Sequence, residues 1–136
     1  MRYPKGYTKT YKYKMNQKYT SLNSYIKDKF SKQKYNSKKR GIDWSLTIEN
    51  IFFLLDEQEG ECAVTGIKMT HFKHDKVKDN QVGRGVDTNV SFDRIDSSKG
   101  YTLNNVRLVC YAVNWMKNTL TDKKFKAWAR AIYRGL

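Results

Sequence analysis

Residues 90–117 constrain the fold of this chain more than any other part of the sequence. The segment begins with a short run of alternating apolar and polar residues, continues through a loop rich in serine and glycine, and alternates again up to Cys110. From Tyr111 the apolar residues recur every three or four positions, which is the period of an α-helix. The segment therefore predicts a strand, a loop, a second strand and a helix. The apolar side of that helix is expected to consist of Ala112, Val113, Met116 and Leu120.

Two polar residues of this unit can bind the same cation. Asp93 lies at the end of the first predicted strand, and Asn114 lies within the predicted helix. A carboxylate and an amide oxygen can converge on one hard cation, because such a site needs only one or two protein oxygens beside a substrate phosphate. The pair predicts a site for a divalent cation, Mg²⁺ or Mn²⁺, with Asp93 and Asn114 as ligands.

At these positions the sequence resembles the HNH nucleases of the ββα-metal (His-Me finger) superfamily, in a form with a D-R-I-D motif that is frequent in phages. The matching residues are Cys62, Thr65, Gly66, Ser91, Asp93, Arg94, Ile95, Asp96, Gly100, Tyr101, Asn105, Val106, Asn114 and Lys117. The resemblance covers roughly residues 44–117. It implies that Asp93 and Asn114 hold the metal and that Asn105 clamps the loop. It also implies a histidine as general base after Asp93, where this chain has Arg94.

Arg94 changes the expected chemistry, because a guanidinium does not lose its proton in proteins. We expect Arg94 to bind the scissile phosphate or to neutralise its developing charge. The general base must then lie elsewhere, and a tyrosine, whose ordinary pKa is about 10, would need help from Arg94 or the metal. The candidate bases are His71, His74, Tyr101, Tyr111, Asp96 acting through a water, and a water on the metal itself. Lys117, one helical turn beyond Asn114, is expected to contact phosphate or to bridge to Asp93.

The charge of the chain is concentrated at its N-terminal end. Residues 1–40 contain 13 lysines and arginines and one acidic residue, which gives +12 of the total formal charge of +14. Such an arm predicts a polyanionic partner, since each neutralised phosphate releases counterions. A membrane surface or an acidic protein would also attract the arm, but neither would require the motif of residues 90–117. DNA is therefore the expected partner.

Three groups of residues are expected to approach DNA. In residues 1–20, tyrosines that can stack on bases alternate with lysines that can bind phosphate, although a solvated tail is the alternative. Residues 68–89 are polar and lack periodicity, which predicts an insertion loop that either lies in a DNA groove or is solvated. The individual basic residues expected to bind DNA are Lys38, Lys39, Arg40, Arg84, Lys99 and Lys117.

Three further helices are predicted around this unit. The first runs from about residue 21 to about residue 39, and the second begins after Thr47 as N-cap and stops near Gly60. A last helix begins after Thr121, with an apolar stripe that is expected to pack into the core. Its stripe consists of Phe125, Trp128, Ala129, Ile132 and Tyr133.

The two cysteines, Cys62 and Cys110, resemble half of a zinc knuckle, but two thiolates do not close a structural site that usually takes four ligands. No structural zinc is expected. Two cysteines also do not make a disulfide framework, and the sequence contains neither an apolar membrane segment nor the apolar core of a signal peptide. A reducing cytoplasmic location is therefore expected, with no membrane partner.

Together these features predict an α+β fold with a basic Tyr-rich arm over residues 1–20 and one domain over residues 21–136. The ββα-metal unit is expected at about residues 90–118. The resemblance implies a metal-dependent DNA endonuclease that hydrolyses phosphodiester bonds, encoded by a phage or mobile element and acting in the bacterial cytoplasm as a monomer or homodimer. The alternatives are a catalytically impaired DNA-binding protein with the HNH fold and a basic structural or assembly protein that binds nucleic acid.

Overall fold

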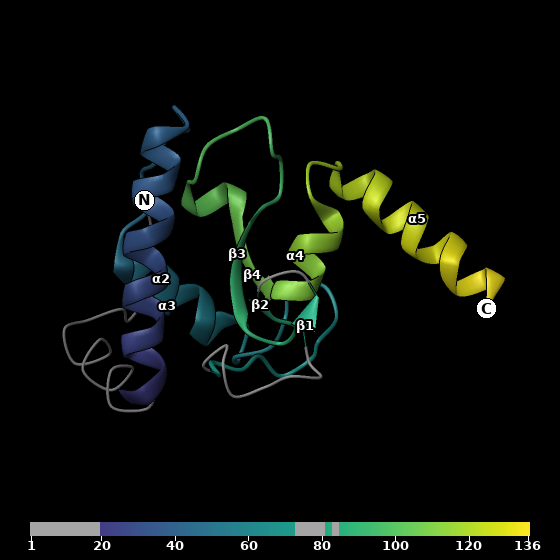
Figure 1. The fold of residues 1–136 in the computed structure, drawn as a ribbon, viewed down its shortest axis with the longest axis horizontal. Helices are drawn as coiled ribbons and strands as arrows, with labels where there is room; N and C mark the ends of the chain where they lie inside the picture. Colours follow the sequence, from purple (N-terminus) through teal and green to yellow (C-terminus); the bar gives the residue numbers. More distant parts are fainter. Residues whose placement is uncertain (1–19, 73–80, 83–84) are drawn as a thin grey trace.

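The computed structural model describes residues 20–72, 81–82 and 85–136. The basic arm, except for its last residue, and the candidate residues His74 and Arg84 lie outside the described residues. The described part combines helices with two small antiparallel sheets, β1–β2 and β3–β4, which confirms the α+β class (Figure 1). The elements are α2 (Thr20–Lys39), α3 (Ile48–Glu57), β1 (Gln81–Val82), β2 (Gly85–Val86), β3 (Val90–Arg94), the 3₁₀ turn η2 (Leu103–Asn105), β4 (Val106–Cys110), α4 (Tyr111–Lys117) and α5 (Asp122–Gly135).

The hairpin of β3 and β4 is the centre of the fold, and α4 follows β4 without a linker. The strands pair in register from Val90 opposite Cys110 to Arg94 opposite Val106. The helices α2 and α3 lie on one side of the hairpin and α4 on the other (Figure 1), so both faces are covered. This explains why four of the five residues of β4 are buried instead of alternating. The predicted strand, loop, strand and helix are confirmed.

The supporting helices form as their sequences predict. Leu22 and Ile26 on one side of α2 are buried in the core. Thr47 caps α3 through a reciprocal pair of hydrogen bonds with Asn50, which satisfies backbone groups that the first turn leaves unpaired. The chain leaves α3 through Gly60, whose positive φ of 72° suits glycine.

Gly100 allows the loop between β3 and β4 to pass close to the segment before α3. Tyr101 N donates to Asp43 O at 2.8 Å, and Ser45 N donates to Tyr101 O at 3.0 Å. A Cβ atom on Gly100 would lie 2.5 Å from Asp43 O, which is backbone and cannot easily move away. The glycine of the D-R-I-D motif region is therefore required by a close approach of two backbones.

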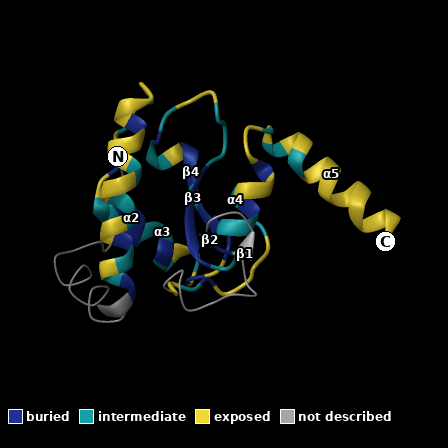
Figure 2. Cartoon of the chain, in the orientation of Figure 1, coloured by how far each residue is buried: buried dark blue, intermediate teal, exposed yellow. Residues whose placement is uncertain are grey.

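Only Phe125 of the apolar stripe of α5 packs against the core, so the prediction is wrong for Trp128, Ile132 and Tyr133. Thr121 caps the helix as expected, but α5 contains no buried residue and extends away from the hairpin (Figure 2). Trp128 and Ile132 are each 63% exposed. Helical periodicity identifies an apolar side, but it does not identify what the helix packs against.

Two smaller predictions also differ from the structure. In α4 the buried residues are Val113 and Lys117, while Met116, expected on the apolar side, is exposed together with Trp115. The predicted insertion loop is partly structured, because β1 pairs with β2 and Val90 N donates to Thr70 O at 3.1 Å. Among the described helices, none is both long enough and apolar enough to cross a membrane.

Candidate active site

A cleft of about 650 Å³ opens between the β3–β4 hairpin, α4 and the C-terminal part of α2. It brings together six residues that the sequence identifies as candidates: Arg40, Asp93, Arg94, Tyr101, Tyr111 and Asn114. Gln33 and Arg40 line it from α2 and the turn that follows, and Trp115 and Met116 line it from α4. The strand–loop–strand–helix unit thus places its polar residues around one hollow.

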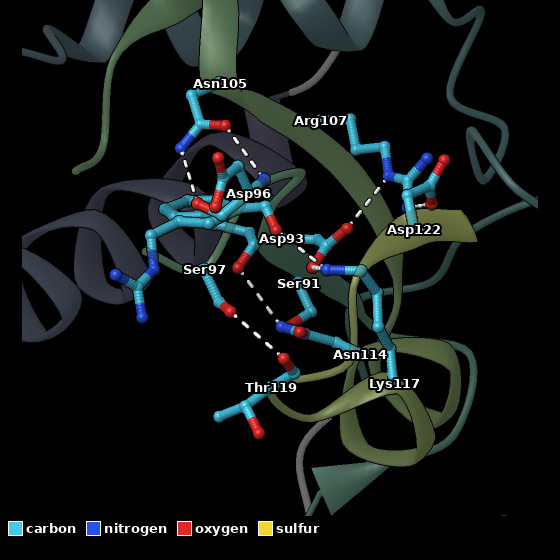
Figure 3. A network of polar contacts seen from close by, with 12 residues as sticks. Ser91, Asp93, Asp96, Ser97, Asn105, Arg107, Asn114, Lys117, Thr119 and Asp122 are labelled. Carbon is cyan, nitrogen blue, oxygen red and sulfur yellow. Dashed lines mark hydrogen bonds and ion pairs between the residues drawn. The ribbon is translucent and has the colours of Figure 1, made fainter. Parts of the chain in front are cut away.

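Asp93 is almost completely buried, at 2% exposure, and each of its carboxylate oxygens receives a cationic donor. Arg107 Nε donates to Oδ2 at 2.8 Å, and Lys117 Nζ donates to Oδ1 at 3.1 Å (Figure 3). A buried carboxylate requires such partners, because an unpaired charge is strongly unfavourable away from water. The charge of Asp93 is therefore balanced by the protein itself.

The ion pairs continue from Arg107 to the first turn of α5. Arg107 Nη2 donates to Asp122 Oδ1 at 2.5 Å, and Lys126 Nζ lies 2.9 Å from Asp122 Oδ2. Partial burial would raise the pKa of Asp122, but the bonds from Arg107 and Lys126 outweigh it and hold that pKa below its usual value. Burial acts to lower the pKa of Arg107, and the bonds to Asp122 and Asp93 raise it overall.

Lys117 has no solvent-exposed surface. Besides Asp93, its ammonium group donates to Arg94 O at 2.8 Å. Of the two roles expected for Lys117, contact with DNA phosphate stays a prediction, and the buried side chain offers no exposed surface for it in this structure. The bridge to Asp93 is what the structure contains.

The side-chain amide of Asn114 is held on β3 through its nitrogen. Its Nδ2 donates to Ser91 Oγ at 2.7 Å and to Phe92 O at 3.1 Å, so the nitrogen is fixed on β3 (Figure 3). Within the described part of the chain, Oδ1 accepts no hydrogen bond. The amide oxygen is thus available to a cation or to a ligand in the cleft.

The oxygen donors of Asp93 and Asn114 suit a divalent cation that takes further ligands from elsewhere. Among residues 20–72, 81–82 and 85–136, no three His, Cys, Asp or Glu side chains gather around one position. Each oxygen of Asp93 retains a lone pair after accepting from Arg107 or Lys117, and Asn114 adds a neutral oxygen. Such a set fits a hard cation like Mg²⁺ that takes its remaining ligands from water and phosphate, and it does not form a complete protein cage.

Asn105 fixes the loop between the strands. Its Nδ2 donates to Asp96 O at 3.0 Å and to Gly100 O at 2.9 Å, while its Oδ1 accepts from Asp96 N at 2.9 Å. One buried amide therefore ties both ends of the turn that contains Ser97 and Lys99. These are the contacts that a loop clamp needs.

Arg94 lies over Tyr101 at the edge of the cleft. Its guanidinium carbon is 5.2 Å from the centre of the Tyr101 ring, a cation–π contact, and Nη1 donates to Lys99 O at 2.9 Å. The hydroxyl of Tyr101 accepts from Gln33 Nε2 at 2.7 Å. The ring of Tyr111 packs against Gly85, where a Cβ atom would lie 2.8 Å from it.

The other candidate bases lie elsewhere. His71 is exposed and near Tyr25, with ring centres 6.4 Å apart, and does not line the cleft. Asp96 also lies outside the set of lining residues. Its Oδ1 accepts from the hydroxyl and backbone N–H of Ser98 at 2.6 and 2.9 Å, and these bonds lower its pKa. Tyr101 and Tyr111 are therefore the candidates that the structure places at the site.

A second hollow, of about 580 Å³, adjoins the cleft and shares Arg40 and Arg94 with it. Lys99 also lines this hollow, so two expected DNA-binding residues, Arg40 and Lys99, lie around one surface with Arg94. Lys38 and Lys39 are exposed at the end of α2 but line neither hollow. Arg84 is outside the described residues.

Sequence reasoning missed Arg107 and the role of Asp122. Arg107 stands in an apolar strand outside any motif, and Asp122 is the first residue of α5 after the predicted cap Thr121. The register of the hairpin places Arg107 directly opposite Asp93, on the same face. An alignment of the two predicted strands would have shown this pair.

The cysteines are both buried in the core, and Cys110 N donates to Cys62 Sγ at 3.3 Å. Burial acts to raise the pKa of Cys62, but bonds from Thr65, Cys110 and Val64 outweigh it and lower that pKa. Burial and the neighbouring Cys62 raise the pKa of Cys110 to about 12. The absence of structural zinc stays a prediction.

No protein-family model and no curated protein matches the sequence. Among solved structures, the chain is similar to the rare-cutting HNH restriction endonuclease PacI, with a TM-score of 0.56 and 24% sequence identity. The similarity covers 81% of this chain and 78% of that chain. It shows that the chain has an HNH-like α+β fold.

Proposed function

We propose that this protein is a metal-dependent DNA endonuclease of the HNH type that hydrolyses phosphodiester bonds with Mg²⁺ or Mn²⁺. The observation that carries the proposal is that Asp93, Arg94 and Asn114 line one cleft on a strand–loop–strand–helix unit within an HNH-like fold. The sequence resemblance to the HNH nucleases and the fold similarity to PacI both support this proposal.

Asp93 and Asn114 would hold the divalent ion, which when bound stabilises negative charge on the scissile phosphate and on the leaving oxygen. Arg94 would bind the same phosphate, since it donates one hydrogen bond to Lys99 O and a guanidinium has five N–H groups. Asn105 holds the loop that carries Lys99 and thereby fixes the position of Arg94. By binding phosphate, Arg94 would supply charge compensation, but it would not take over the proton transfer of the family histidine.

The attacking water would be positioned or deprotonated by Tyr101 or Tyr111, the two candidate bases in the cleft. The hydroxyl of Tyr101 is held by Gln33 and lies beside the cation of Arg94. His74 stays a further hypothesis, because it lies outside the described residues.

The DNA backbone would run across the hollow lined by Arg40, Arg94 and Lys99. Lys38, Lys39 and Arg84 would extend this contact, and the arm of residues 1–20 would bind DNA outside the single domain of residues 21–136. A phage or mobile-element origin and action in the bacterial cytoplasm complete the proposal, with the protein acting either as a monomer that nicks DNA or as a homodimer with two active sites. The strongly basic arm and the D-R-I-D motif support it.

The direct test is incubation of the purified protein with supercoiled plasmid in Mg²⁺ or Mn²⁺ and in chelator. Cleavage is expected with metal and not with chelator, and it should disappear in Asp93→Asn and Asn114→Ala. Asp28→Asn is the matched control, since Asp28 is an exposed carboxylate paired with Lys32 on α2. Full activity of both site variants would refute the assignment of the metal ligands.

A second candidate function is DNA binding without cleavage. It is favoured by the two cations that already neutralise Asp93 and by the arginine in place of the family histidine. A protein that retards plasmid in a gel but leaves it intact with Mg²⁺, Mn²⁺, Co²⁺ and Ni²⁺ would support this alternative.

A further inference from the structure

Lys117 occupies a position that is suited to a metal ion. Its Nζ lies 3.1 Å from Asp93 Oδ1 and 2.8 Å from the carbonyl oxygen of Arg94, and the side chain has no exposed surface. A carboxylate and a backbone carbonyl are the oxygen donors that hard divalent cations take in proteins. The ammonium group thus lies among ligands of the kind that a metal would use.

The two carboxylates around this position are already paired with three cations. Asp93 and Asp122 are paired with Arg107 and Lys117, and Lys126 adds a further positive charge at Asp122. A divalent ion that entered beside Asp93 would add two positive charges to a group that needs none. Repulsion between the ion and the buried ammonium would oppose its binding.

We propose that Lys117 is a resident cation of the Asp93 site, whose ammonium group competes with a divalent ion for Oδ1. This inference rests on the proposed metal-dependent function and adds a property to it. The protein alone binds a divalent ion weakly, and the phosphate of bound DNA supplies the negative charge that lets the ion enter. Lys117 keeps the buried carboxylate compensated until then.

The test is the affinity of the DNA-free protein for Mn²⁺, measured from the electron paramagnetic resonance signal of the free ion. Lys117→Met removes the charge and keeps the length of the side chain. It is expected to bind Mn²⁺ about 10- to 100-fold more tightly than the parent, the range over which neighbours of metal ligands alter affinity. The double variant Asp93→Asn, Lys117→Met is expected to lose this gain.

Lys32→Met is the matched control, because Lys32 also pairs with an aspartate but on the exposed side of α2. Its Mn²⁺ affinity should equal that of the parent. If Lys117→Met binds Mn²⁺ no more tightly than the parent, Lys117 is not a competitor and the proposal is refuted.

Removal of the buried charge in Lys117→Met can prevent folding, and the proposal also predicts what Mn²⁺ should then do. If Lys117→Met does not fold in chelator, refolding in Mn²⁺ should restore the native circular dichroism spectrum, because the ion replaces the lost cation. Failure of Mn²⁺ to restore it would overturn the proposal. The outcome is separate from the nuclease test. Lys117→Met can bind Mn²⁺ more tightly even if the parent protein never cuts DNA. Conversely, the parent can cut DNA even if Lys117→Met binds Mn²⁺ no more tightly.

Discussion

Asp93 and Arg107 face each other directly across the β3–β4 hairpin, and Nε of the arginine lies 2.8 Å from Oδ2 of the aspartate. The side chain of Arg107 is 13% exposed and that of Asp93 is 3% exposed. The pair therefore links a strand residue of the candidate site to its partner strand in a region from which water is largely excluded. Its removal should affect stability as well as activity.

Arg107→Leu should lower the free energy of unfolding by about 3 kcal/mol, because it leaves Asp93 and Asp122 without their shared partner in a mostly buried site. Urea unfolding monitored by circular dichroism measures this. Lys32→Leu, at an exposed pair, should change stability by less than about 1 kcal/mol. Equal effects of the two variants would contradict the burial argument.

Arg94→Ala should reduce plasmid cleavage about 10- to 100-fold, since a charge-assisted bond to phosphate contributes about 1.5–3 kcal/mol. Arg94→His should behave differently and gain a pH dependence near the pKa of imidazole, because histidine can accept a proton at neutral pH. Cleavage rates from pH 5 to 9 measure both. Arg130→Ala, on exposed α5, is the control. Parental activity in Arg94→Ala would remove Arg94 from the mechanism.

Gly100→Ala should destabilise the protein by about 1–3 kcal/mol, because the new methyl group would lie 2.5 Å from the backbone oxygen of Asp43. Gly135→Ala is the matched control, with no atom within 4 Å of the added Cβ. Thermal unfolding of the two variants measures the difference. A Gly100→Ala protein as stable as the control would show that the two backbones can separate without loss.

Stability at alkaline pH should depend on Tyr25. Burial raises its pKa from 10.0 to about 12, and its hydroxyl donates to Val90 O at 3.1 Å. Because the folded-state pKa lies above the unfolded value, the contribution is complete below pH 10 and is lost as the pH rises towards 12. Tyr25→Phe should lose less stability than the parent over that interval. Tyr35→Phe, whose tyrosine is 64% exposed on the same helix, should follow the parent.

Ile132→Ala should change the free energy of unfolding by less than about 0.5 kcal/mol, because Ile132 is exposed on α5. Ile51→Ala should reduce it by about 2–5 kcal/mol, because Ile51 is completely buried. Urea unfolding compares the two at low protein concentration. A large effect at Ile132 would mean that α5 packs against another surface in solution.

The local elements and some of the residues that line the cleft could be predicted from the sequence. Periodicity and capping residues identified the hairpin and the helices, and motif spacing placed Asp93 and Asn114 on elements that meet. These features depend on short-range order along the chain, which a sequence displays directly.

The partners of long side chains could not be predicted in the same way. For Lys117 the sequence leaves two partners open, phosphate and Asp93, and the structure contains the bond to Asp93. The stripe of α5 looks like a core face, yet in the described part of the protein only its Phe125 packs against the core. Both outcomes depend on where separate elements dock, and periodicity within one element does not contain that information.

Asp122 has two structural roles: it is the first residue of α5, and it is the second carboxylate that pairs with Arg107. A surface helix start ordinarily tolerates substitution, but here a change would release the guanidinium that faces Asp93. Among homologues of this protein, positions 93, 107, 117 and 122 should therefore vary together or stay fixed. The constrained residues would extend from the cleft along these ion pairs as far as the first turn of α5.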